Sequence, residues 1–231
     1  MSNPVQQHLT DELARGLGIT AGSAEVPMVF LDIETCGLGW HDPVWEVAAI
    51  RRVWGEPDRE FQTFVEHDPA AADALPDKFR VDHDTRYDPA RAVSAEGLGE
   101  WLAEVAAPLG KVRPVLLGAV PMFDATRLHE QFGLDPWHYR PVCVETMAWT
   151  ALHLATPAGP GPLAAPGGHD PLSLPWASDP LTRTLGVPSV TNADGRYTAL
   201  VDARWARDTF DAVMARRPAA SLAGLDRAGA A

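Results

Sequence analysis

Two acidic residues close a short apolar run near the start of the chain, in the sequence MVFLDIETCGL at residues 28–38. The apolar run is too short for a helix and lies between Pro27 and Gly37, which is typical of a buried strand. Asp32 and Glu34 are two residues apart, so their side chains point to the same face, ~7 Å apart along the strand. Their repulsion would raise both pKa values, and a divalent cation would relieve it because hard cations prefer carboxylate oxygens. The alternative is a strand end with two solvated acids.

Two further acids follow predicted elements. Asp124 lies just past a predicted strand at residues 112–120, and Asp202 lies early in a predicted helix at residues 199–216. Open α/β sheets bind ligands at the carboxyl ends of their strands, so we expect Asp32, Glu34 and Asp124 to converge at one edge. The alternative for Asp202 is a first-turn acid that interacts favourably with the helix dipole.

Composition limits the possible classes of protein. The chain has 231 residues, of which 46% are apolar, and this suits one well-buried domain with tails. A net charge of −12 argues against electrostatic capture of long duplex nucleic acid, although bound metal ions could still hold a strand end. Two cysteines are too few for a disulfide framework, and the sequence has neither a membrane-spanning run nor the apolar core of a signal peptide. We therefore expect a cytoplasmic protein with no membrane association.

Periodicity predicts the elements that must position these acids. Residues 43–54 and 59–66 are predicted to form an antiparallel hairpin, residues 67–92 a loop with at most one short helix, and residues 139–144 a fifth strand. Helices are predicted at residues 95–107, 123–132, 145–155 and 180–185, and a long loop at 156–177. Residues 1–24 read as an amphipathic helix and a linker, and residues 217–231 as a flexible tail. The predicted fold is a mixed five-stranded α/β sheet, with an antiparallel hairpin edge and parallel strands, flanked by helices.

The segments LDIETCGL, FDATRL and YTALVDA occur in an order that resembles the DEDD (DnaQ-like) 3′→5′ exonuclease superfamily, which has a ribonuclease H-like fold. The resemblance covers residues 27–215 and implies an exonuclease domain at 25–216. It also implies that two Mg²⁺ or Mn²⁺ ions are held by the four carboxylates Asp32, Glu34, Asp124 and Asp202. Oxygen-only ligands fit these ions better than Zn²⁺.

The third motif departs from the family pattern. Its spacing is that of the histidine branch, but Tyr197 occupies the position of the histidine. A tyrosine with a pKa of ~10 is a poor base, so we expect Tyr197 to orient the attacking water through its hydroxyl. The alternatives are that Tyr197 only packs at the helix entrance, or that His169 replaces the histidine. Val120 also differs from an asparagine common in relatives.

The resemblance also implies contacts to the nucleic acid. Leu38 matches a residue that packs on the terminal base, and Thr35 matches one that meets the terminal sugar. Trp40 and His41 could extend this wall or cover the sheet, and Trp45 and Trp54 are expected in the core. The predicted function is metal-dependent 3′→5′ exonuclease activity on single-stranded DNA or RNA ends, releasing nucleoside monophosphates. The alternative is a non-catalytic binding or assembly module that kept the fold.

Overall fold

The computed structural model describes residues 26–155, 174–188 and 198–215. A six-stranded sheet with the order β4-β3-β2-β1-β5-β6 forms its centre. β1 pairs antiparallel with β2, as β2 does with β3, while the β1–β5, β3–β4 and β5–β6 pairs are parallel. The strands are β1 (Met28–Thr35), β2 (Val44–Arg52), β3 (Arg59–Val65), β4 (Ala92–Val93), β5 (Val115–Gly118) and β6 (Val142–Cys143). The mixed α/β sheet with a hairpin is confirmed, and the two-residue β4 adds one strand to the five predicted.

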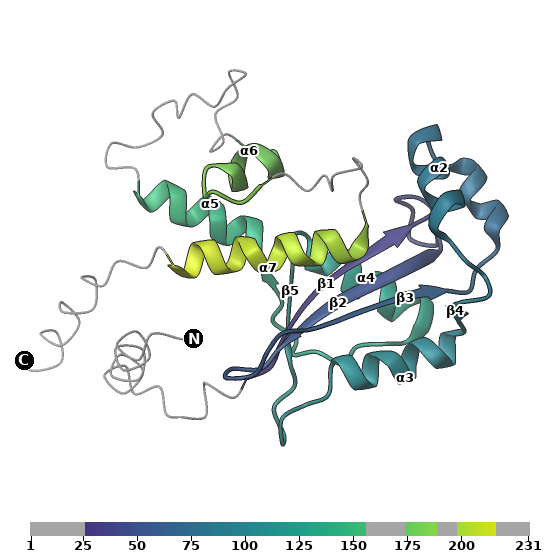
Figure 1. The fold of residues 1–231 in the computed structure, drawn as a ribbon, viewed down its shortest axis with the longest axis horizontal. Helices are drawn as coiled ribbons and strands as arrows, with labels where there is room; N and C mark the ends of the chain where they lie inside the picture. Colours follow the sequence, from purple (N-terminus) through teal and green to yellow (C-terminus); the bar gives the residue numbers. More distant parts are fainter. Residues whose placement is uncertain (1–25, 156–173, 189–197, 216–231) are drawn as a thin grey trace, which may run out of the picture.

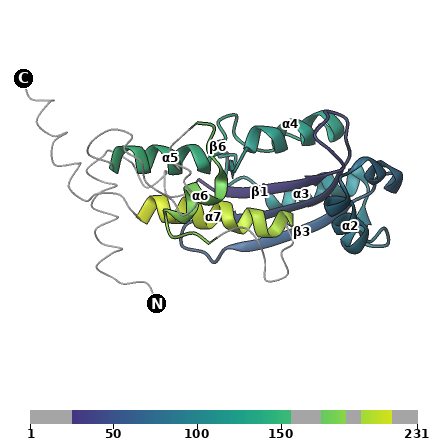
Figure 2. The same ribbon diagram turned by 90° about the horizontal axis from the view of Figure 1, so that it is seen from above.

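Helices cover both faces of the sheet because β1 is apolar on both sides. Val29, Leu31 and Ile33 pack with α3 (Ala95–Val105) and α4 (Pro121–Phe132). Phe30 points to the opposite face, where α5 (Val144–Ala155), α6 (Ser178–Arg183) and α7 (Ala199–Ala215) form a second core. Figure 1 shows α7 in yellow lying along β1 and β2, with α5 and α6 beside it. Seen from above, α5 and α2 lie towards opposite ends of the elongated molecule (Figure 2).

The segment expected to be mainly loop contains a 3-10 helix, η2 (Pro69–Ala74), and a ten-residue α-helix, α2 (Asp77–Arg86). The apolar residues of α2 do not predict it, since Phe79 and Val81 are 48% and 61% exposed. Instead, α2 is anchored by polar side chains: His83 is buried, and the Arg86 guanidinium donates to the buried carboxylate of Glu46. Hydrophobic periodicity cannot reveal a helix whose inward face is polar.

Two smaller expectations need correction. Trp45 is buried as predicted, but Trp54 is 59% exposed, because β2 ends at Arg52 and Trp54 lies in the following turn. The predicted strand at residues 139–144 shrinks to Val142–Cys143, and Tyr139 is 74% exposed. No helix in the described part of the chain is long and apolar enough to cross a bilayer. The predicted N-terminal helix, most of the long loop and the C-terminal tail lie outside the described residues.

Candidate active site

β1 carries two of the predicted acids within the strand rather than beyond its end, because the strand continues to Thr35. Asp32 and Glu34 share a face with Phe30, whose side chain packs in the core under α5, α6 and α7. Both carboxylates therefore point to the side of the sheet that α7 covers. Both residues are only partly exposed, so they are not the fully solvated acids of the alternative interpretation.

α7 brings the third acid to this face. Its first turn begins after Thr198, whose hydroxyl accepts a hydrogen bond from the Val201 amide at 3.1 Å, as an N-cap does. Ala199 and Ala203 are fully buried, and their small side chains allow the helix to lie close to the sheet. Asp202, between them, reaches the β1 acids: one oxygen each of Asp32, Glu34 and Asp202 lie within 4.8 Å of one another.

Asp124 approaches from the other side of β1, in the first turn of α4. It does not belong to the tight set of three, but it is only 5% exposed, and its charge raises the pKa of Asp32. Asp202 in turn raises the pKa of Asp124. The four acids predicted from sequence therefore act on one another, although they come from β1, α4 and α7.

Burial is the largest cause of the raised pKa values of these carboxyls. The pKa of Asp32 lies well above its usual range because of burial and the charges of Asp124, Asp202 and Glu34. Burial and neighbouring acids raise the pKa of Glu34 to about 8 and that of Asp202 to about 7. Burial also raises the pKa of Asp124 to about 8, although the Arg127 guanidinium opposes the shift.

These four residues fit a site for hard divalent cations. The donors are all carboxylate oxygens, which suit Mg²⁺ or Mn²⁺. Without a cation, these acids, of which Asp124 is buried and the other three are half-buried, repel one another and hold protons near neutral pH. A bound cation would replace those protons and remove the repulsion.

The sequence analysis missed a further acid beside these four, Glu46. It lies in β2 directly opposite Glu34 and is fully buried. Its carboxylate accepts hydrogen bonds from Arg86 and Gln62, and from the Ala199 amide at 3.4 Å. The Glu46 charge raises the pKa of Glu34 and of Asp202. The signal was present as a lone acid inside the apolar strand sequence VWEVAAI.

The loop after β1 forms one wall of the site. Arg127, 2% exposed, donates from Nη2 to the carbonyls of Leu38 at 2.6 Å and Gly39 at 3.2 Å. At the start of the loop, a Cβ on Gly37 would lie 2.2 Å from the Asp42 carboxylate, which accepts from the Gly39 amide at 2.6 Å. A side chain at residue 37 would therefore displace the Asp42 carboxylate, and Arg127 of α4 holds the loop in place.

The predicted substrate residues lie on this wall. Leu38 and Trp40 are 84% and 64% exposed, so both side chains are accessible to a ligand. The Thr35 hydroxyl donates to the Gly37 carbonyl at 2.6 Å.

Val120, at the N-cap of α4, is 59% exposed and provides no side-chain cap. Tyr197 and His169 lie outside the described residues, so their predicted roles stay predictions.

The chain matches no protein-family model and no curated protein by sequence. Its fold is similar to solved structures of exonuclease I. The E. coli enzyme in complex with a 5cy-dT13 oligonucleotide has a TM-score of 0.58 and 18% identity over 84% of this chain and 42% of that chain. The zinc-bound E. coli ExoI–ssDNA complex has a TM-score of 0.59 and 18% identity, over 84% and 41% of the two chains.

A product-bound structure of exonuclease I has a TM-score of 0.58 and 16% identity, covering 84% of this chain and 44% of that chain. The chain thus spans about two fifths of the length of these structures. At this identity the similarity shows the fold alone. The described residues therefore have the ribonuclease H-like fold found in exonuclease I.

Proposed function

We propose that this chain is a metal-dependent 3′→5′ exonuclease that hydrolyses single-stranded nucleic acid ends and releases nucleoside monophosphates. The observation that carries the proposal is the meeting of Asp32, Glu34 and Asp202 within 4.8 Å, with Asp124 close enough to perturb Asp32. Acids that are partly or wholly buried and repel one another lower the stability of a fold unless a cation compensates them. A binding module without catalysis has no physical need for such a set.

Asp32, Glu34, Asp124 and Asp202 would hold two Mg²⁺ or Mn²⁺ ions. When bound, such a pair supplies an activated water and stabilises the leaving oxygen of an in-line displacement. The chain's own residues position the reactants. Glu46, opposite Glu34 in the sheet, accepts hydrogen bonds from the Ala199 amide at the start of α7 and from Arg86 of α2. Arg127 donates a hydrogen bond to the Leu38 carbonyl and so fixes the loop that carries Leu38.

The substrate is proposed to be an unpaired 3′ end. A net charge of −12 does not favour a long duplex track. The exposed Leu38 and Trp40 side chains offer apolar surfaces on which terminal bases can pack, whatever the base. The exonuclease I structures contain DNA oligonucleotides, so single-stranded DNA is the first substrate to test, with RNA of matched sequence beside it.

The test is digestion of a 5′-labelled oligonucleotide with Mg²⁺ or Mn²⁺. Wild type should release mononucleotides stepwise from the 3′ end, and Asp202→Asn should reduce the rate at least ~10²-fold by removing a metal ligand. Asp208→Asn, an exposed aspartate of the same helix, is the matched control and should keep the activity. If wild type releases nothing with either metal and calorimetry detects no Mn²⁺ binding, the chain is a non-catalytic module.

A separate test concerns Tyr197, which is proposed to orient the attacking water. Tyr197→Phe should lower kcat while leaving oligonucleotide binding unchanged. Tyr197→His should restore activity with a pH dependence near neutrality, because histidine titrates there. Equal activity of wild type and Tyr197→Phe across pH would remove the hydroxyl from the mechanism.

A further inference from the structure

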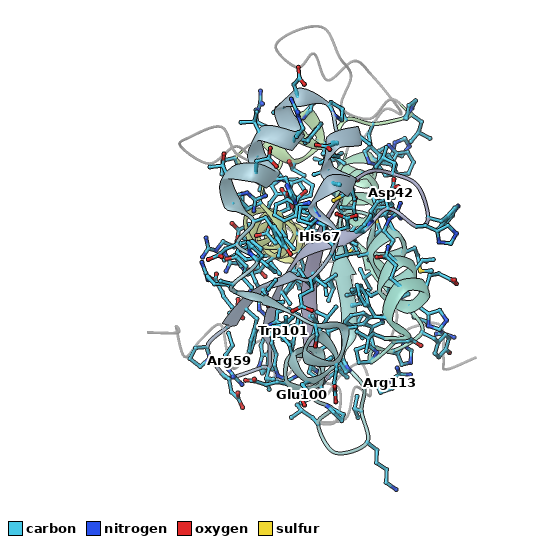
Figure 3. The ribbon with its side chains drawn as sticks, turned by 90° about the vertical axis from the view of Figure 1, so that its right-hand side faces the viewer. Asp42, Arg59, His67, Glu100, Trp101 and Arg113 are labelled. Atoms are coloured by element: carbon cyan, nitrogen blue, oxygen red, sulfur yellow. The ribbon has the colours of Figure 1, made fainter. Side chains whose placement is uncertain are left out.

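A second group of ligand-type side chains lies beside the carboxylates. Cys36 follows β1, His67 follows β3, and His83 lies in α2. One ligand atom of each lies within 4.8 Å of the other two. Cys36 is 3% exposed and His83 is 2% exposed. In Figure 3, which faces this end of the sheet, His67 lies beneath α2.

Aromatic rings enclose this group. The Tyr87 ring lies 4.3 Å from the His67 ring and 5.2 Å from the His83 ring, centroid to centroid. The Trp45 ring meets the His83 ring edge-on at 5.1 Å. Apolar walls of this kind exclude water and strengthen any interaction between the buried polar atoms.

The hydrogen bonds of the two histidines fix where their protons lie. His67 Nδ1 is 3.0 Å from the Val65 carbonyl, and His83 Nδ1 is 3.0 Å from the Asp84 carboxylate. A carbonyl and an ionised carboxylate only accept, so both Nδ1 atoms must carry the proton. In two neutral rings, the Nε2 lone pairs then face each other at 3.0 Å, which is repulsive unless a cation or an extra proton lies between them.

We propose that Cys36, His67 and His83 bind a zinc-class transition-metal ion at a site separate from the carboxylates. Sulfur and imidazole nitrogen are the ligands that Zn²⁺ prefers. Two nitrogens on a tetrahedral Zn²⁺, each at about 2.0–2.1 Å, lie about 3.3 Å apart, close to the observed 3.0 Å. The bonds from Nδ1 to Val65 and Asp84 are the outer contacts that orient metal-bound histidines.

Such an ion would join three segments that support the carboxylate site. Cys36 is two residues beyond Glu34, so the ion would fix the end of β1. His83 is in the same helix as Arg86, whose guanidinium pairs with Glu46. Burial raises the pKa of the Cys36 thiol to about 11, so binding must displace the thiol proton. The ion therefore has a supporting role, independent of whether the chain is a nuclease.

The test is Co²⁺ titration of the full chain after removal of metal, at a fixed neutral pH. Wild type should show a thiolate-to-cobalt charge-transfer band that saturates during the titration and disappears when Zn²⁺ is added. Cys36→Ser should abolish the band, and His67→Gln should weaken Co²⁺ binding at least ~10-fold. Cys143→Ser is the matched control, because Cys143 is the other cysteine of the chain, and it should keep the band.

Asp202→Asn should also keep the band, which separates this site from the proposed nuclease centre. If Cys36→Ser does not fold, X-ray absorption at the zinc edge of the wild-type protein decides, with one sulfur and two nitrogens expected around the ion. Absence of the band in wild type, a band that follows Cys143, or a zinc shell of oxygen alone would overturn the proposal. If the band is absent in wild type, the Nε2 atoms of the two histidines share a proton instead of a metal ion.

Discussion

Replacing Asp124 by asparagine should stabilise the metal-free protein, and the gain should grow with pH. Burial and the Asp202 charge raise the pKa of Asp124 from 3.8 to about 8. Between these values the native chain holds a proton that the unfolded chain has lost, so stability falls as pH rises. Each such group lowers the free energy of unfolding by about 1.4 kcal/mol per pH unit. The stabilisation that the Asp124 proton gives the native state is fully present below the pKa of the unfolded state and is lost by about pH 8.

Asparagine has a similar shape and no proton to lose, so the variant escapes this decline. From about pH 5 to about pH 7, Asp124→Asn should gain roughly 2–3 kcal/mol relative to wild type. The same variant should have lost exonuclease activity, because Asp124 is a proposed metal ligand. Stability and activity would therefore change in opposite directions.

Urea unfolding with a chelator at about pH 5, 6 and 7 measures this difference. Asp73→Asn, at an exposed position in η2, is the control and should follow wild type at every pH. Mg²⁺ or Mn²⁺ at ~100 times its Kd should stabilise wild type by about 2.7 kcal/mol, and the variant by less. If the free energies of unfolding of wild type and Asp124→Asn change in parallel with pH, the pKa of Asp124 is not raised in the native state.

The remaining predictions concern the residues around the carboxylates. Arg86→Ala should lower the free energy of unfolding by about 3–5 kcal/mol, because it leaves the buried Glu46 carboxylate without its guanidinium; a loss below ~1 kcal/mol in urea unfolding would contradict this. Arg127→Ala should raise KM for a short oligonucleotide more than it lowers kcat, since the Leu38 and Gly39 carbonyls lose their hydrogen-bond donor. An unchanged KM would show that the loop keeps its conformation without Arg127. Trp40→Ala should change the free energy of unfolding by less than ~0.5 kcal/mol, because the side chain is 64% exposed. If a base stacks on Trp40, the same variant should weaken the binding of single-stranded DNA by about 1–3 kcal/mol, which fluorescence anisotropy can measure.

The pattern of neighbouring residues was sufficient to predict the strands and helices whose apolar side chains recur at a regular spacing. Alternation along β1 predicted that Asp32 and Glu34 share a face, and the hairpin of β2 and β3 followed from two strand-like runs with a short turn between them. The helix carrying Asp202 was equally clear, because its apolar residues recur at helical spacing. These features depend on the order of neighbouring side chains, and sequence contains that order directly.

Tertiary structure alone decided the contacts between segments that have no pattern in common. Strand pairing placed Glu46 opposite Glu34, and a polar anchor held α2 against the sheet. The meeting of Cys36, His67 and His83 arises in the same way. Each of these arrangements depends on strand register and on buried polar contacts across long sequence separations. Such contacts are selected by the free energy of the whole packed chain, and no local run of residues encodes them.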